Sequence, residues 1–91
     1  MSGPRKPLAV ALHYERPNVP RVTAKGRGAA AEKMLELARA HGVPIEHNEA
    51  LAAALAQVEL DQEIPENLFR AVAEVLGYIL RMSVRTRPGP R

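Results

Sequence analysis

Prolines near the start of the chain limit what its first apolar run can form. The run Leu8–Tyr14 (LAVALHY) lies between Pro7 and Pro17. This leaves too little room for a stable helix, because proline interrupts helical hydrogen bonding and short helices are marginal in water. We therefore predict a buried strand. Arg21–Lys25 contains β-branched residues and ends before Gly26, which predicts a second strand. A loop of about five residues would join the two strands as an antiparallel hairpin.

The rest of the chain alternates between helical and extended patterns. Apolar residues recur at helical spacing over residues 28–41, and Gly42 is suited to end that helix. We predict a brief third strand over residues 43–46 and a second helix over residues 48–57, which Asn48 can cap. Pro65 suits the first turn of a last helix. The expected order is β-β-α-β-α-α. This is an α+β domain, α/β-like in its alternation, with a sheet of about three to four short strands packed with three or more helices.

The composition limits the size and the chemistry of this domain. With 91 residues, of which 46% are apolar and 25% charged, one small soluble domain is expected. Aromatic residues make up only 3%, so aliphatic side chains must form the core, with little room for a large enclosed cavity. The chain has no cysteine, which excludes disulfides and thiolate chemistry. No apolar run approaches the roughly 18–20 residues of a membrane span, so we expect a cytoplasmic protein.

Charge is segregated along the chain. The two ends are basic, whereas residues 28–80 carry nine of the ten acidic side chains and three of the 13 Lys and Arg residues. We expect residues 1–7 to be a flexible arm, residues 8–81 the folded domain, and residues 82–91 a basic disordered tail. The basic ends leave an alternative function open, namely nucleic-acid binding through phosphate contacts. Against it, no aromatic residues are interleaved with the arginines to stack on bases.

Motifs for catalysis are missing. The sequence has no G-x-S-x-G, no Walker-type phosphate loop and no H-E-x-x-H. Both serines, Ser2 and Ser83, lie near the chain ends, where a nucleophile is poorly positioned. The histidines His13, His41 and His47 lack the close spacing of a zinc motif. We therefore expect no enzyme, no metal ion and no cofactor.

Two surfaces are candidates for binding another protein. The last predicted helix has a wide apolar stripe, which is most simply core, although part of it could line a groove that accepts short apolar peptide segments. Four acidic residues precede or begin this helix: Glu59, Asp61, Glu63 and Glu66. They are either a solvated loop or a docking surface for a basic partner.

Four short segments carry a pattern more specific than composition. They are Leu8–Tyr14 (LAVALHY), Pro20–Gly26 (PRVTAKG), His41–Ile45 (HGVPI) and Gln62–Leu76 (QEIPENLFRAVAEVL). In this order they resemble the strand after the cleavage site, the P-x-V-x-A-K-G turn, the H-G-V/I-P step and the final helix of the FlhB/YscU family. These proteins are the export switches of flagellar and virulence type III secretion. The resemblance spans residues 8–81 and implies the family's cytoplasmic domain, a small sheet wrapped by helices.

The sequence departs from the family pattern in two ways. The family's membrane-spanning region has no counterpart here, so we expect a free-standing cytoplasmic domain. The family's Asn-Pro-Thr-His self-cleavage motif is replaced by Pro4–Pro7 (PRKP), and the chain contains no Asn-Pro pair. Cleavage requires an Asn side chain to attack its own peptide carbonyl and form a cyclic imide. We therefore expect no autocleavage.

The resemblance also implies a function. We expect a non-enzymatic component or modulator of flagellar or type III protein export, which stands in for or competes with the cleaved cytoplasmic domain of the export-switch protein. Its partners would be proteins of the export apparatus and early substrates such as rod and hook components, met in the cytoplasm or at the inner-membrane export gate. The resemblance places a shallow apolar substrate site between the hairpin turn and the last helix, at Val19, Pro20, Ala73 and Leu76.

Overall fold

A computed structural model describes the backbone of residues 7–86 and the side chains of residues 7–77. The predicted hairpin is confirmed: β1 (Leu8–His13) pairs antiparallel with β2 (Arg21–Arg27). The pairing shifts register between Ala11 and Leu12 and leaves Thr23 unpaired in a bulge. The hydroxyl of Thr23 donates to the Ala11 carbonyl at 3.3 Å, which holds the bulge in the hairpin.

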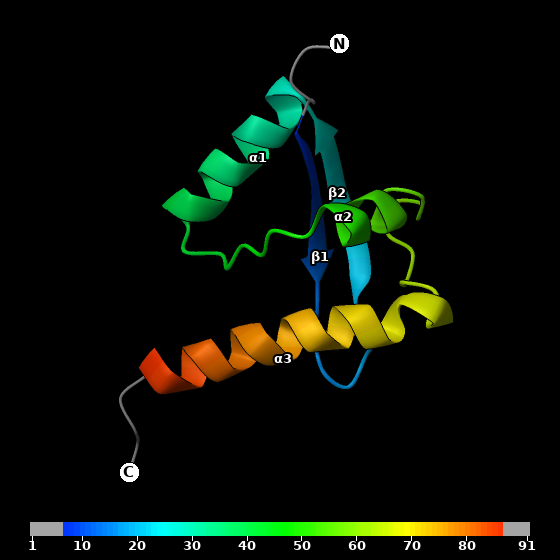
Figure 1. Ribbon diagram of the computed structural model, residues 1–91, viewed down its shortest axis with the longest axis vertical. Coiled ribbons are helices and arrows are strands. Elements are labelled where there is room, and N and C mark those ends of the chain that lie inside the picture. Colours follow the sequence, from blue (N-terminus) through cyan, green and yellow to red (C-terminus); the bar gives the residue numbers. More distant parts are fainter. Residues whose placement is uncertain (1–6, 87–91) are drawn as a thin grey trace.

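The first helix packs closely on the hairpin because Gly26, at the point of contact on β2, has no side chain. This helix, α1 (Ala29–Ala40), follows Gly28, whose φ of 64° lies in the left-handed region that favours glycine. A Cβ added to Gly26 would lie 2.7 Å from Met34 Sδ. Figure 1 shows α1 starting at the end of the hairpin that is far from its turn.

The core lies on the other side of the hairpin and draws on four parts of the chain. Its central side chains are at most 4% exposed: Val22, Leu55, Ile64 and Val72. They come from β2, from α2 (Glu49–Leu55), from the connection after α2, and from α3 (Phe69–Thr86). Figure 1 shows α3 crossing the hairpin near its turn. Because no single element supplies this core, the helices and the hairpin must assemble together.

The sheet of the described residues has two strands, fewer than the three to four predicted. Residues 43–46 do not form the expected third strand, because no neighbouring strand is present for them to pair with and Pro44 has no N–H to donate. Instead, the connection after α2 runs along β2. The Asp61 amide donates to the Val22 carbonyl (2.6 Å), and the Val22 amide donates to the Gln62 carbonyl (3.1 Å). The predicted α+β class is nevertheless confirmed.

The start of α2 agrees with the sequence, its end at Leu55 comes before the predicted residue 57, and the start of α3 differs. The Asn48 side chain caps α2 as predicted, since its Oδ1 accepts a hydrogen bond from the Leu51 amide at 3.0 Å. Pro65 is followed by a 3-10 turn, η1 (Glu66–Leu68), before α3 begins. Helix α3 continues to Thr86 and includes residues 82–86 of the predicted tail.

The first proline in that direction is Pro88, which explains why the helix can extend so far. The rest of the predicted basic tail, residues 87–91, and residues 1–6 of the predicted arm lie outside the described residues.

Candidate functional site: an apolar groove between the hairpin turn and α3

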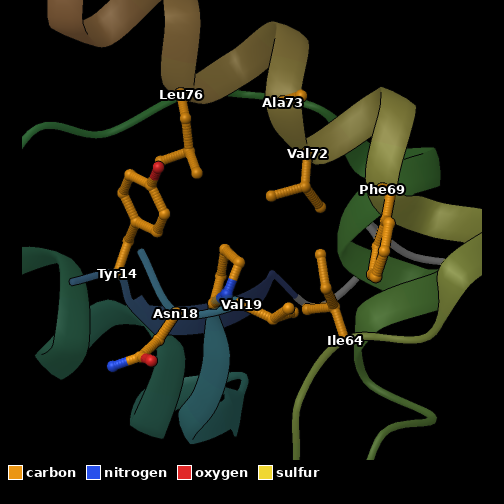
Figure 2. A pocket seen from close by; sticks show the side chains of 9 residues that line it. Tyr14, Asn18, Val19, Ile64, Phe69, Val72, Ala73 and Leu76 are labelled. Carbon is orange, nitrogen blue, oxygen red and sulfur yellow. The ribbon is translucent and has the colours of Figure 1, made fainter. Parts of the chain in front are cut away.

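An apolar groove of about 330 Å³ lies between the hairpin turn and α3 (Figure 2). Nine residues line it: Tyr14, Asn18, Val19, Pro20, Ile64, Phe69, Val72, Ala73 and Leu76. None of them carries a charge, and Tyr14 and Asn18 are the two that have polar side-chain groups. A surface of this kind favours an apolar ligand, because a charged group placed there would lose hydration without gaining a partner.

One wall of the groove is the chain between β1 and β2. A tight turn forms there, in which the Asn18 amide donates to the Glu15 carbonyl at 2.8 Å. Pro20 is buried and Val19 is half-buried. The Pro20 carbonyl accepts a hydrogen bond from the Ile64 amide at 3.0 Å. The hairpin turn is thereby tied to the connection that leads into α3.

The other wall is one face of α3. Phe69, Val72, Ala73 and Leu76 follow the i, i+3, i+4, i+7 spacing, which places them on the same side of a helix. Val72 is 1% exposed and forms the floor, whereas Phe69 is 40% exposed at one end. Figure 2 shows Tyr14 below Leu76 at the other end, and the Asn18 side chain pointing away from the groove. Exposed aromatic side chains therefore mark both ends.

The structure brings the four sequence-derived site residues together. Val19 and Pro20 lie on the hairpin wall, Ala73 and Leu76 lie on the α3 wall, and all four line the same groove. Their role in binding stays a prediction. The other five lining residues were not predicted from the sequence: Tyr14, Asn18, Ile64, Phe69 and Val72. The helical spacing from Phe69 to Leu76 was the available signal for the two α3 residues, and no comparable signal marked the other three.

The remaining candidates lie apart from one another. His13 is 3.4 Å from Glu15, and His41 Nδ1 is 2.9 Å from the Leu37 carbonyl at the end of α1. Among the side chains that the structure describes, no group of three or more His, Asp or Glu residues could hold a metal ion. Within residues 7–86, no helix combines the length and the apolar character that a membrane crossing requires.

The acidic residues before α3 border a second, more polar groove. It has a volume of about 490 Å³ and includes Glu59 and Glu63 in its lining. Arg21 lies 3.7 Å from Glu63 and offsets part of the negative charge. Asp61 has a φ of 67°, so the chain turns sharply at this point. A docking surface for a basic partner here stays a prediction.

This chain matches a known protein family. The profile of the FlhB HrpN YscU SpaS family matches residues 6–79. An uncharacterised protein of Bacillus subtilis, YlqH, is 37% identical over 76 residues, which cover 81% of this chain and 82% of YlqH. The flagellar biosynthetic protein FlhB of Aquifex aeolicus is 38% identical over 76 residues, which cover 80% of this chain but 22% of FlhB.

A solved structure agrees with these sequence matches. The cytoplasmic domain of FlhB from Shewanella putrefaciens superposes with a TM-score of 0.76 at 43% identity, covering 80% of this chain and 63% of that one. The chain thus spans most of YlqH and about a fifth of the FlhB relative. Sequence and fold agree over the same region, and this chain belongs to the FlhB HrpN YscU SpaS family.

Proposed function

We propose that this protein is a non-enzymatic component or modulator of flagellar or type III protein export, and that its groove binds short apolar segments of early export substrates. Family membership relates it to export proteins, among them a flagellar biosynthetic protein. One observation carries the binding role: Val19 and Pro20 on the hairpin wall and Ala73 and Leu76 on α3, which are far apart in the sequence, line one groove, and none of the lining residues is charged.

The size and chemistry of the groove suit a weak, transient contact. Burying one Val- or Leu-sized side chain contributes about 1.5–3 kcal/mol. The groove is open and small, so it can bury only a few such side chains, and association itself costs several kcal/mol. We therefore expect dissociation constants between about 10 µM and 1 mM. A substrate that must be handed on to an export channel is better served by such a site than by a tight one.

An acidic substitution at Ala73 tests the groove directly. Ala73 is exposed, so Ala73→Asp should leave the fold intact while placing a carboxylate among apolar side chains. The assay is fluorescence anisotropy with overlapping peptides that cover a hook subunit. We expect at least one peptide to bind the unmodified protein, and Ala73→Asp to weaken its affinity about tenfold or more.

The matched control is Ala53→Asp, which introduces the same charge at an exposed alanine of α2 outside the groove. Its affinity should equal that of the unmodified protein. Equal affinities for the two variants would show that the peptide binds elsewhere. If no peptide bound the unmodified protein at millimolar concentration, the proposed function would be wrong.

The role within export depends on whether the domain stands in for its FlhB counterpart or competes with it. Expression in flagellated cells whose FlhB ends before its cytoplasmic domain separates these roles. Restored motility would support a stand-in role. A competitor would instead leave those cells non-motile and reduce motility in cells with intact FlhB. Ala73→Asp should abolish either effect, because both require the groove.

A further inference from the structure

Two basic side chains of β2 hold the connection between α2 and α3. Lys25 Nζ donates to the carbonyls of Ala56 (3.0 Å) and Val58 (2.8 Å), where α2 has just ended. Arg21 Nη1 donates to the carbonyl of Asp61 at 2.7 Å. Carbonyls beyond a helix C-terminus lack helical partners and carry partial negative charge, so a cation is well suited to bind them. The connection is thereby fastened to β2 at both ends.

This connection also carries the α3 wall of the groove. It ends at Ile64, which is 4% exposed, lines the groove, and bonds through its amide to the Pro20 carbonyl on the hairpin wall. Only Pro65 and η1 separate Ile64 from Phe69, the first residue of α3. The position of α3 relative to the hairpin turn is therefore set by where the connection lies on β2.

The backbone contacts of the connection depend on the same placement. The two bonds that Val22 makes with Asp61 and Gln62 form only if this part of the chain runs beside β2. Among the residues that the structure describes, no backbone hydrogen bond joins the α2 end of the connection to β2, and the Lys25 ammonium holds that end instead. Loss of that ammonium would leave two carbonyls without their cation and let the α2 end move away from the strand.

We propose that Lys25 and Arg21 are positioning residues of the groove, which set the separation between its two walls by clamping the α2–α3 connection onto β2. This inference rests on the proposed binding function of the groove, but the clamp itself can be measured without a ligand. Neither side chain is among the residues that line the groove. A change in peptide affinity on substituting either residue would therefore not come from a lost contact with the ligand.

The test measures the distance between the walls in solution. The chain has no cysteine, so Arg16→Cys and Glu74→Cys introduce two unique sites for spin labels. Arg16 is exposed in the hairpin turn, Glu74 is exposed on α3, and neither residue lines the groove. Pulsed dipolar spectroscopy should give one narrow distance distribution with Lys25 present. Lys25→Met keeps the aliphatic stem but removes the ammonium, and we expect a broader or shifted distribution together with about tenfold weaker peptide binding.

Matched variants distinguish the clamp from a general loss of stability. Lys25→Arg retains a cation and should restore the narrow distribution at least in part. Lys33→Met removes an exposed lysine of α1 and should change neither readout. If Lys25→Met fails to fold, Arg21→Gln provides the same test through the Asp61 carbonyl.

An unchanged distance distribution and unchanged affinity in folded Lys25→Met would overturn the proposal. A broadened distribution in a protein that binds no peptide would leave the clamp standing and refute the proposed function instead. The two failures are thus separable.

Discussion

Substituting Gly26 by alanine tests the close packing of α1 on β2. The added Cβ would lie 2.7 Å from Met34 Sδ, 3.0 Å from the Ala30 carbonyl carbon and 3.1 Å from Ala30 Cβ. Met34 can move its flexible thioether, but the Ala30 backbone can yield only if α1 shifts away from β2. Overpacking of this kind costs about 1–3 kcal/mol.

An opposing effect makes the sign of the result informative. Alanine restricts the unfolded chain more than glycine does, which stabilises a protein by about 0.4–1 kcal/mol where the backbone tolerates it. We expect the steric cost to exceed this gain, with a net loss of about 1–2 kcal/mol in the free energy of unfolding. For a domain of this size, each kcal/mol lowers the melting temperature by about 4–8 °C.

The assay is chemical denaturation followed by circular dichroism, combined with a double-mutant cycle. In a Met34→Ala background, Gly26→Ala should cost less because the shortest contact is gone, although the Ala30 contact persists. Gly42→Ala is a useful comparison, since a Cβ there meets nothing within 4 Å and the cost comes only from the φ of 68°. A Gly26→Ala protein as stable as the unmodified one, or more stable, would refute the packing argument.

Two further predictions concern the cap of α2 and the N-terminal segment of the chain. Asn48→Ala removes the acceptor for the Leu51 amide and should destabilise the domain by about 1 kcal/mol in thermal unfolding, whereas Asn48→Asp should retain most of the stability. A loss for Asn48→Asp as large as that for Asn48→Ala would show that the loss does not come from the capping hydrogen bond. Because Pro4–Pro7 contains no asparagine, the purified chain should stay uncleaved, and mass spectrometry should find one intact species after prolonged incubation. A fragment that begins near residue 5 would contradict this.

The helices and the hairpin were predictable because their signals are local. Prolines excluded a helix over Leu8–Tyr14, Asn48 marked the start of α2, and the resulting elements are those of the structure. The third strand over residues 43–46 was wrong for a reason that local signals do not carry. A strand exists only if a neighbouring strand offers hydrogen-bond partners, and here the chain beside β2 is the connection at Asp61–Ile64.

The site was predictable only through resemblance. Val19, Pro20, Ala73 and Leu76 were named because their positions match those of a family, since apolar residues at these positions fit core packing as well as a groove. The structure shows that Val72 forms the buried floor of the groove and that Phe69 is partly exposed at one end, although both lie on the same apolar stripe of α3. Helical periodicity defines the face of a helix, but the opposing surface decides which part of that face is covered.

Local chemistry along the chain therefore determined the helices, the hairpin, the cap of α2 and the absence of thiol chemistry, because these depend on composition or on residues close together in the sequence. The tertiary structure alone decided that Lys25 reaches the carbonyls after α2 and that Ile64 bonds to Pro20. It likewise decided that the hairpin turn faces α3 across a groove. Those contacts join residues dozens of positions apart, and they form only when burial of Val22, Leu55 and Val72 in one core brings their elements together.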